Sequence, residues 1–128
     1  MPFHCELDRE SQVLCTAFDG SFTFGDFLAS GEETRRHITD KITAVIWDYT
    51  EVTSFDVSTA EVRQMAAMPS PYPAGIPSIA VAPTDYVYGM FRMFQILSEA
   101  TRPHLGVVRT REDAYRMLGI ARMNFDRV

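Results

Sequence analysis

The chain has 128 residues, 46% of them hydrophobic and 23% charged, a composition typical of one globular domain spanning residues 1–128. Its formal net charge is -5 and its basic residues are scattered, which argues against a nucleic-acid partner, because phosphate binding needs clustered Lys and Arg. The sequence has no apolar run near the ~20 residues of a membrane-spanning helix, and its N-terminus does not resemble a signal peptide. We therefore expect a cytoplasmic protein without a membrane span.

The N-terminal segment is expected to form a β-hairpin. Apolar and polar residues alternate through Phe3–Asp8 and again through residues 12–18, and a short polar break separates the two runs. Two such runs should pair as antiparallel strands. The dipeptide Asp19-Gly20 is typical of a turn, so the second strand is predicted to end there.

Four segments are predicted to be helices, because a capping residue precedes apolar residues at helical spacing in each of them. The caps are Thr23, Ser58, Thr84 and Thr110. The first helix is expected to bury Phe24, Phe27 and Leu28. The longest helix should begin at Thr84 and run to about Thr101.

Three apolar runs between the helices are predicted to be parallel strands, at residues 43–47, 78–82 and 106–109. The first run is continuously apolar, so we expect a central strand covered on both faces, and we expect Trp47 and Phe91 to be largely buried. Residues 69–77 contain four prolines and a glycine and should be irregular. The resulting order ββαβαβαβα predicts an α/β fold with a five-stranded mixed sheet, an N-terminal antiparallel hairpin and helices packed on the sheet.

Polar side chains are expected at the carboxyl ends of the parallel strands, where ligands bind in open α/β sheets. Candidates for such a binding rim are Asp48, Thr50, Asp56, Ser58, Thr84 and Asp85. Each also has a structural explanation, since Ser58 and Thr84 cap helices and Asp48 closes a strand. The sequence favours these structural roles over a binding site.

The longest helix carries a second apolar row beside its core-facing one, and this row is the candidate interaction surface. It contains Tyr86, Gly89, Met93, Ile96 and Ala100. A surface helix usually has one apolar stripe, so the extra row should be covered. The cover is expected to be the 69–77 loop, a second subunit or an apolar ligand.

No catalytic, cofactor or metal site is recognisable in the sequence. The strands are not followed by a glycine-rich phosphate loop, there is no GxSxG nucleophile motif, and the three histidines share no metal-ligand spacing. Cys5 and Cys15 fall in the two hairpin strands, where we expect reduced thiols, with a cross-strand disulfide as the less favoured alternative. A less favoured enzyme hypothesis would use Asp48, Asp56 and His104.

The order of the elements and several segments carry a resemblance to a known family. The segments are WDYT at 47–50, EVTSFD at 51–56, the capped helix start at Ser58, AVAPTDYVYGMFRM at 80–93 and EDAYRML at 112–118. Together they resemble the STAS family of SpoIIAA-like anti-sigma-factor antagonists, and within it a bacterial branch of unknown function. The resemblance covers essentially the whole chain and implies a SpoIIAA-like fold with a regulatory, protein-binding role.

The chain departs from this family at the phosphorylation site. STAS regulators are phosphorylated on the first Ser after the motif's Asp, and here Val57 occupies that position, Ser58 matches the second Ser, and Thr59 replaces a Gly. The resemblance thus implies a non-enzymatic module without the usual phosphoserine switch, although Ser58 and Thr59 stay open as substitutes. Its partner would be a protein, including a second copy of itself. The related CRAL-TRIO lipid carriers suggest the alternative, a carrier of an apolar small molecule with the 69–77 loop as a lid.

Overall fold

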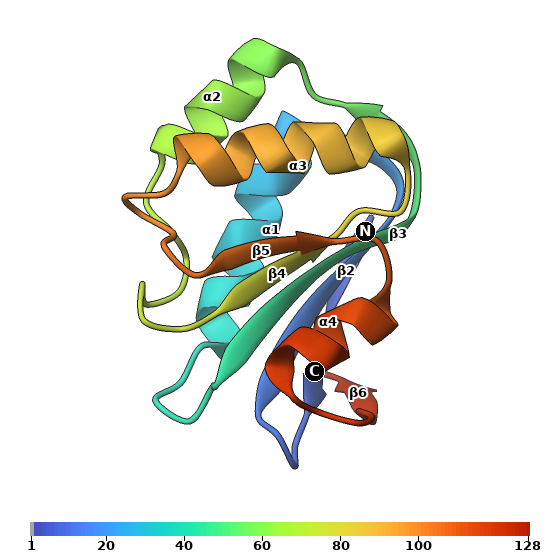
Figure 1. Ribbon diagram of the computed structural model, residues 1–128, viewed down its shortest axis with the longest axis vertical. Coiled ribbons are helices and arrows are strands. Elements are labelled where there is room, and N and C mark those ends of the chain that lie inside the picture. The colour runs from blue at the N-terminus through green and yellow to red at the C-terminus, as the bar shows by residue number, and fades with distance from the viewer. Residues whose placement is uncertain (1) are drawn as a thin grey trace.

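The computed structural model describes residues 2–128, which form one six-stranded sheet with four helices packed on it (Figure 1). The strands are β1 (Phe3–Asp8), β2 (Val13–Thr23), β3 (Ala44–Asp56), β4 (Ser78–Val81), β5 (Leu105–Val108) and β6 (Phe125–Arg127). The helices are α1 (Phe24–His37), α2 (Thr59–Ala67), α3 (Asp85–Leu97) and α4 (Arg111–Leu118). Within residues 2–128, none of the helices has the length and hydrophobicity needed to cross a bilayer.

The sheet has the strand order β5-β4-β3-β2-β1-β6. As predicted, β1 and β2 pair antiparallel, while β3, β4 and β5 run parallel to one another and β2 joins them in the same direction. The predicted strand count of five is wrong, because β6 adds a sixth strand antiparallel to β1. With three residues, β6 is too short to show the alternation from which strands are predicted.

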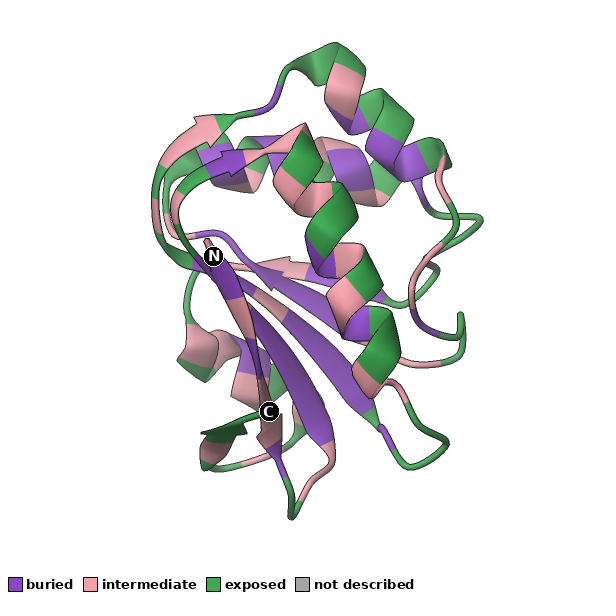
Figure 2. Cartoon of the chain, turned by 180° about the vertical axis from the view of Figure 1, so that it is seen from behind, coloured by how far each residue is buried: buried purple, intermediate pink, exposed green. Residues whose placement is uncertain are grey.

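Both faces of β3 are covered, as its continuous apolar run predicts. On one face, Tyr49 packs into the core beneath α2 and α3, and α1 lies over the same face of β1 and β2. On the other face, Ala44 and Ile46 pack against Ala114 of α4. Burial continues along the whole middle of the sheet, which Figure 2 shows as strands that are mostly purple.

Strands β2 and β3 both extend past their predicted ends, β2 to Thr23 and β3 to Asp56. Gly20 therefore lies inside a strand rather than in a turn between elements. Its φ of 68° coincides with a shift in the β2–β3 register, a bulge that lets the ladder bend and continue. Beyond the end of β4 the two strands form a ribbon held by aromatic contacts, which begin with Phe18 stacked on Tyr49 at 4.6 Å between ring centres.

The inner face of α1 differs from the prediction. Its buried side chains are Ser30 and Thr34, whereas Leu28 is 40% exposed. The Thr34 hydroxyl lies 2.8 Å from the hydroxyl of Thr16 in β2. The later part of α1 thus lies close to the sheet through small polar side chains, while Leu28 borders a cavity instead of the core.

The two cysteines lie on opposite faces of the sheet. Cys5 pairs with Thr16, and Glu6 pairs with Cys15, so the thiols are one residue out of register. Cys5 faces the layer of α1 to α3, and Cys15 faces α4. Both thiols are buried and free, and their positions on opposite faces rule out the cross-strand disulfide.

Thr34→Val should lower the free energy of unfolding by about 1 kcal/mol, because the buried hydroxyl of Thr16 loses its closest partner. Leu28→Ala is the control on the same helix and should change that free energy by less than about 0.5 kcal/mol, because Leu28 is exposed. Urea unfolding followed by circular dichroism measures both. A larger loss for Leu28→Ala than for Thr34→Val would contradict this orientation of α1.

Candidate functional site

Asp48 lies within β3 rather than beyond its end, opposite Val81, the last residue of β4. Its side chain is 8% exposed and forms an ion pair with Arg111 of α4, with 2.6 Å between Oδ2 and Nε. Its other oxygen accepts hydrogen bonds from the backbone N–H of Thr50, at 2.9 Å, and from the Thr50 hydroxyl. The structure therefore brings the predicted rim residues Asp48 and Thr50 together around an arginine of the chain itself.

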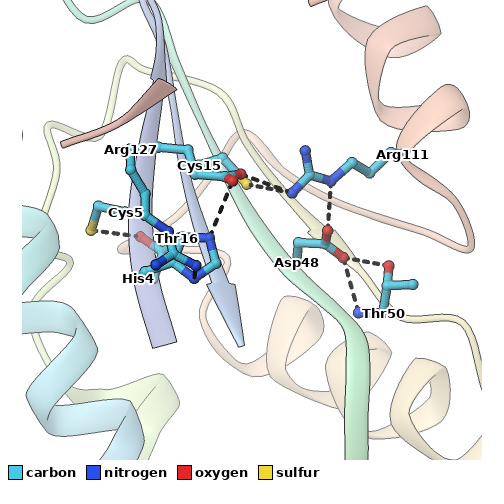
Figure 3. Close-up of polar contacts among 9 residues, drawn as sticks. His4, Cys5, Cys15, Thr16, Asp48, Thr50, Arg111 and Arg127 are labelled. Carbon is cyan, nitrogen blue, oxygen red and sulfur yellow. Dashed lines mark hydrogen bonds and ion pairs between the residues drawn. The ribbon is translucent and has the colours of Figure 1, made fainter. Parts of the chain in front are cut away.

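Arg111 joins three elements of the fold (Figure 3). Its Nη2 lies 3.1 Å from Oε1 of Glu6 in β1 and 3.5 Å from Sγ of Cys15 in β2, and its guanidinium lies 5.2 Å from the centre of the Phe125 ring. Burial raises the pKa of the Cys15 thiol, and Arg111 offsets only part of that effect, so Cys15 is a neutral thiol and a poor nucleophile. Because Arg111 of α4 pairs with Asp48 of β3 and Glu6 of β1, this cluster anchors α4 to the sheet.

Sequence reasoning missed Arg111, although its position carries a signal. Arg111 directly follows the cap Thr110, in the first turn of α4, where the positive end of the helix disfavours a cation. A basic residue there implies a compensating carboxylate elsewhere in the fold. The structure supplies two, Asp48 and Glu6.

Asp56 and Ser58 lie beyond the sheet proper, at the far end of the β2–β3 ribbon. Asp56 is exposed and accepts a hydrogen bond of 2.9 Å from the Ser54 hydroxyl. Ser58 caps α2: its hydroxyl accepts from the Glu61 N–H at 3.1 Å, and the Glu61 carboxylate accepts from the Ser58 N–H at 3.0 Å. Val57, between them, is 3% exposed and packs into the core. The start of α2 is therefore satisfied by its own residues.

Thr84 and Asp85 lie at the start of α3. Thr84 caps the helix, and the exposed Asp85 pairs with Arg109 of the segment after β5 at 2.7 Å. Between residues 2 and 128, no hydrogen bond or ion pair connects these two residues to Asp48 or to Asp56. The six candidates of the predicted rim thus belong to separate local arrangements.

The residues of the enzyme hypothesis lie apart. Asp48 is opposite Val81 at the carboxyl end of β4, whereas the carbonyl of His104 accepts from Ser78 at its amino end. A strand of this length separates its ends by ~10 Å. Asp56 is the last residue of β3, which continues past the carboxyl end of β4, so Asp56 lies further still from His104. Among the residues that the structure describes, no three or more His, Cys, Asp and Glu side chains form a metal-binding group.

The second apolar row of α3 is exposed. Tyr86 is 60% and Ile96 66% exposed, Gly89 is also open to solvent, and Met93 is half-buried at the edge of the core. Of the three covers considered for this row, the 69–77 loop is therefore ruled out. The loop lies on the other side of α3, where its Tyr72 lines a cavity together with core-facing residues of that helix.

Helix α3 ends at Leu97, about one turn before the predicted Thr101. The Ser98 hydroxyl donates to the carbonyl of Phe94 at 2.6 Å, and the backbone N–H of Arg102 donates to the carbonyl of Ser98 at 2.7 Å. These bonds close a turn that leads the chain back to β5. The turn buries Arg102, which is only 4% exposed.

A cavity of about 520 Å³ lies between α1, α3 and the loop that follows α2. Its apolar wall includes Trp47, Tyr49, Tyr72, Phe91, Phe94 and Leu105. Phe91 is 3% exposed, as predicted, but Trp47 is only half-buried because it lines this cavity. The volume falls in the range of small-molecule sites. The carrier hypothesis placed an apolar ligand between the longest helix and the 69–77 loop, and the cavity lies there. Periodicity alone could not show it, since it indicates which side chains face inward but not whether they fill the space they enclose.

Comparison with known proteins identifies the fold. No family model and no curated protein matches the chain. It is similar to the solved structure of the anti-sigma factor antagonist SpoIIAA in its unphosphorylated form, with 16% identity, a TM-score of 0.54, and coverage of 94% of this chain and 99% of that chain. The phosphorylated form of the Bacillus cell fate determinant SpoIIAA has 16% identity, a TM-score of 0.47, and coverage of 91% and 98%. The first likeness shows that the chain has a SpoIIAA-like α/β fold, as the sequence resemblance implied.

Asp48→Asn should lower the free energy of unfolding by about 2 kcal/mol, because Arg111 loses its more buried carboxylate. The loss stays below the ~3–5 kcal/mol of a fully buried pair, since the Arg111 side chain is 26% exposed and keeps Glu6. Asp126→Asn removes the exposed partner of Arg9 and should cost less than about 0.5 kcal/mol. Unfolding in guanidinium chloride measures both variants. If Asp48→Asn and Asp126→Asn lose the same free energy of unfolding, the Asp48–Arg111 pair does not anchor α4.

Ser58→Ala should cost about 1 kcal/mol of stability, because the N–H of Glu61 loses its acceptor. Ser58→Asp should keep most of that stability, since Asp is also a good cap and its charge suits the positive end of α2. Thermal unfolding of the two variants separates the outcomes. If Ser58→Asp melts as low as Ser58→Ala, capping is not the role of Ser58.

Proposed function

We propose that the protein is a cytoplasmic, non-catalytic regulatory module, formed by residues 1–128 as one domain, that acts by binding another protein. The similar solved structure is of an anti-sigma factor antagonist, but a shared fold does not by itself carry a function. The observation that carries the proposal is the exposed apolar row of α3. Two buried free thiols agree with a reducing compartment.

The row has the character of a protein-binding surface. Tyr86 and Ile96 are each more than half exposed, and Leu97 at the end of the helix is 45% exposed. Aromatic and aliphatic side chains gathered on one helix face are costly to leave in water and commonly mark interaction sites. Arg92 of α3 and Glu99 after the helix are also exposed, and they would supply part of the polar rim that such surfaces have.

The partner that we propose for this surface is a second copy of the chain, paired about a two-fold axis. In an antiparallel pairing of two α3 helices centred near Met93, Ile96 of one copy would lie opposite Gly89 of the other. Nothing lies within 4 Å of the position that a Cβ of Gly89 would occupy, so the glycine leaves room for the incoming side chain. Small residues let helices approach closely, and an isologous contact covers the row on both copies at once.

The proposed module works without the usual phosphoserine switch. Val57 has no hydroxyl and its side chain is buried, and Ser58, beside it, is engaged in capping α2. Partner binding would then be controlled by concentration or by a ligand rather than by a kinase. Stoichiometric phosphate on Ser58 or Thr59 in protein isolated from its native cell would overturn this part of the proposal.

Carriage of an apolar small molecule is the second candidate function, and the cavity is the observation that favours it. Its walls are mostly aromatic and aliphatic, and the Pro-rich 69–77 loop contributes Pro71 and Tyr72 to one side. Apolar pockets of this size with a few polar groups are typical of ligand sites. Because the cavity and the exposed row lie on opposite sides of α3, the two functions do not compete for the same surface.

Light scattering coupled to size-exclusion chromatography tests the pairing. The wild type should have twice the chain mass of 14.5 kDa, and Ile96→Glu should give a folded monomer, because the change buries a charge in the contact but leaves the monomer surface polar. Gln64→Glu is the matched control: it adds the same charge at an exposed position of α2 and should leave the dimer intact. A wild type that stays monomeric at high concentration, or an Ile96→Glu dimer, would contradict pairing through this row.

A further inference from the structure

Arg102 is buried at the wall of the cavity without a carboxylate partner. The residue is 4% exposed, and its side chain forms no ion pair with any residue of the described chain, 2–128. The Nη1 group donates to the carbonyl of Met68 and to the hydroxyl of Thr101, both at 3.2 Å, and the guanidinium lies 4.8 Å from the centre of the Phe94 ring. These neutral contacts orient the cation but leave its charge uncompensated.

Arg102 lines the cavity beside Tyr72, whose hydroxyl interacts with the guanidinium. Among residues 2–128, no carboxylate pairs with Nε or Nη2, and neither atom is sealed from solvent, so both keep accessible surface on a residue that lines the cavity. Burial lowers the pKa of the Arg102 guanidinium and Tyr72 offsets part of this effect, but an arginine keeps its charge at neutral pH. Nε and one Nη form the planar fork that binds a carboxylate through two hydrogen bonds.

We propose that the cavity binds an amphipathic monoanion, a long-chain carboxylic acid, with its carboxylate on Nε and Nη2 of Arg102 and its chain along Trp47 and Phe94. This inference rests on the second candidate function, carriage of a small molecule, and names the class of ligand. A buried cation without a counter-charge is unfavourable, and an anionic head group supplies that charge where water is scarce.

The charges at the cavity wall favour a ligand with a single negative charge. Among residues 2–128, the only other cation at the cavity wall is Arg35, which lies in the α1 wall and is paired with Glu32 at 3.2 Å. One uncompensated positive charge is neutralised by one carboxylate, whereas the second charge of a phosphate monoester would stay unpaired against an apolar wall. The aromatic and aliphatic lining suits a hydrocarbon chain and has few polar groups for a sugar or nucleotide.

Trp47 makes the site observable. It is the only tryptophan of the chain, and it lies in the cavity wall, with its ring centre 6.2 Å from that of Tyr72. Titration with dodecanoate should therefore change the intrinsic fluorescence. Dodecanol has the same chain and a neutral head, so the ratio of the two dissociation constants measures the preference for the anion. We expect the wild type, freed of copurified lipid, to bind dodecanoate about tenfold to a hundredfold more tightly.

Two variants assign that preference to the arginine. Arg102→Gln should bring dodecanoate to the affinity of dodecanol and leave dodecanol binding unchanged, and Arg102→Lys should recover part of the preference because it restores the charge. If the role of Arg102 were only structural, Arg102→Gln would instead weaken the binding of dodecanoate and dodecanol equally. If Arg102→Gln does not fold, Arg102→Lys carries the assignment: a preference for dodecanoate that is not reduced in Arg102→Lys would overturn the role of Arg102.

Each result of the titrations has a distinct meaning. Equal binding of dodecanoate and dodecanol to the wild type would overturn the anion site and leave carriage of an apolar molecule standing. Binding of neither ligand, by fluorescence and by isothermal calorimetry, would overturn both the anion site and the carrier function. Tighter dodecanoate binding that persists in Arg102→Gln would place the head group elsewhere and also overturn the inference.

Discussion

Strand β3 presents apolar side chains to both faces of the sheet, and the rest of the structure depends on covering both. On one face the cover is the short helix α4 together with Ile120, Met123 and Phe125 of the segment after it, and the Arg111–Asp48 ion pair ties α4 to β3. On the other face three helices provide the cover, and α1 contacts the sheet directly where the hydroxyl of Thr34 meets that of Thr16. The space that these helices enclose without filling is the cavity.

Helix α3 has a different role on each of its sides. Phe91 and Phe94 face the core and the cavity, while Tyr86 and Ile96 face solvent. A ligand in the cavity and a protein on the outer row would therefore contact the same helix from opposite sides. A ligand that binds one position of α3 better than another would shift the helix toward that position and change the surface that the partner meets. Protein binding and ligand carriage are thus compatible in one module.

The parts of the fold that the sequence predicted are those that depend on local patterns. Helix caps such as Ser58 and the apolar run at 43–47 gave the order of elements and the central strand. The residues that define the sites depend on contacts between distant parts of the chain, which a pattern does not contain. Arg111 meets Glu6 only because β1 lies beside β2, and Arg102 is buried only because the turn after α3 folds back onto the sheet. Leu28 looks like a core residue until the unfilled space beside it is known.

Whether the cavity is a binding site is tested most directly by a crystal structure of the protein grown with dodecanoate. The predicted result is a carboxylate within hydrogen-bonding distance of Nε and Nη2 of Arg102, with the hydrocarbon chain against Trp47 and Phe94. A ligand bound with its head group at the Glu32–Arg35 pair in the α1 wall, or on the outer surface of α3 with the cavity still empty, would contradict the role assigned to Arg102.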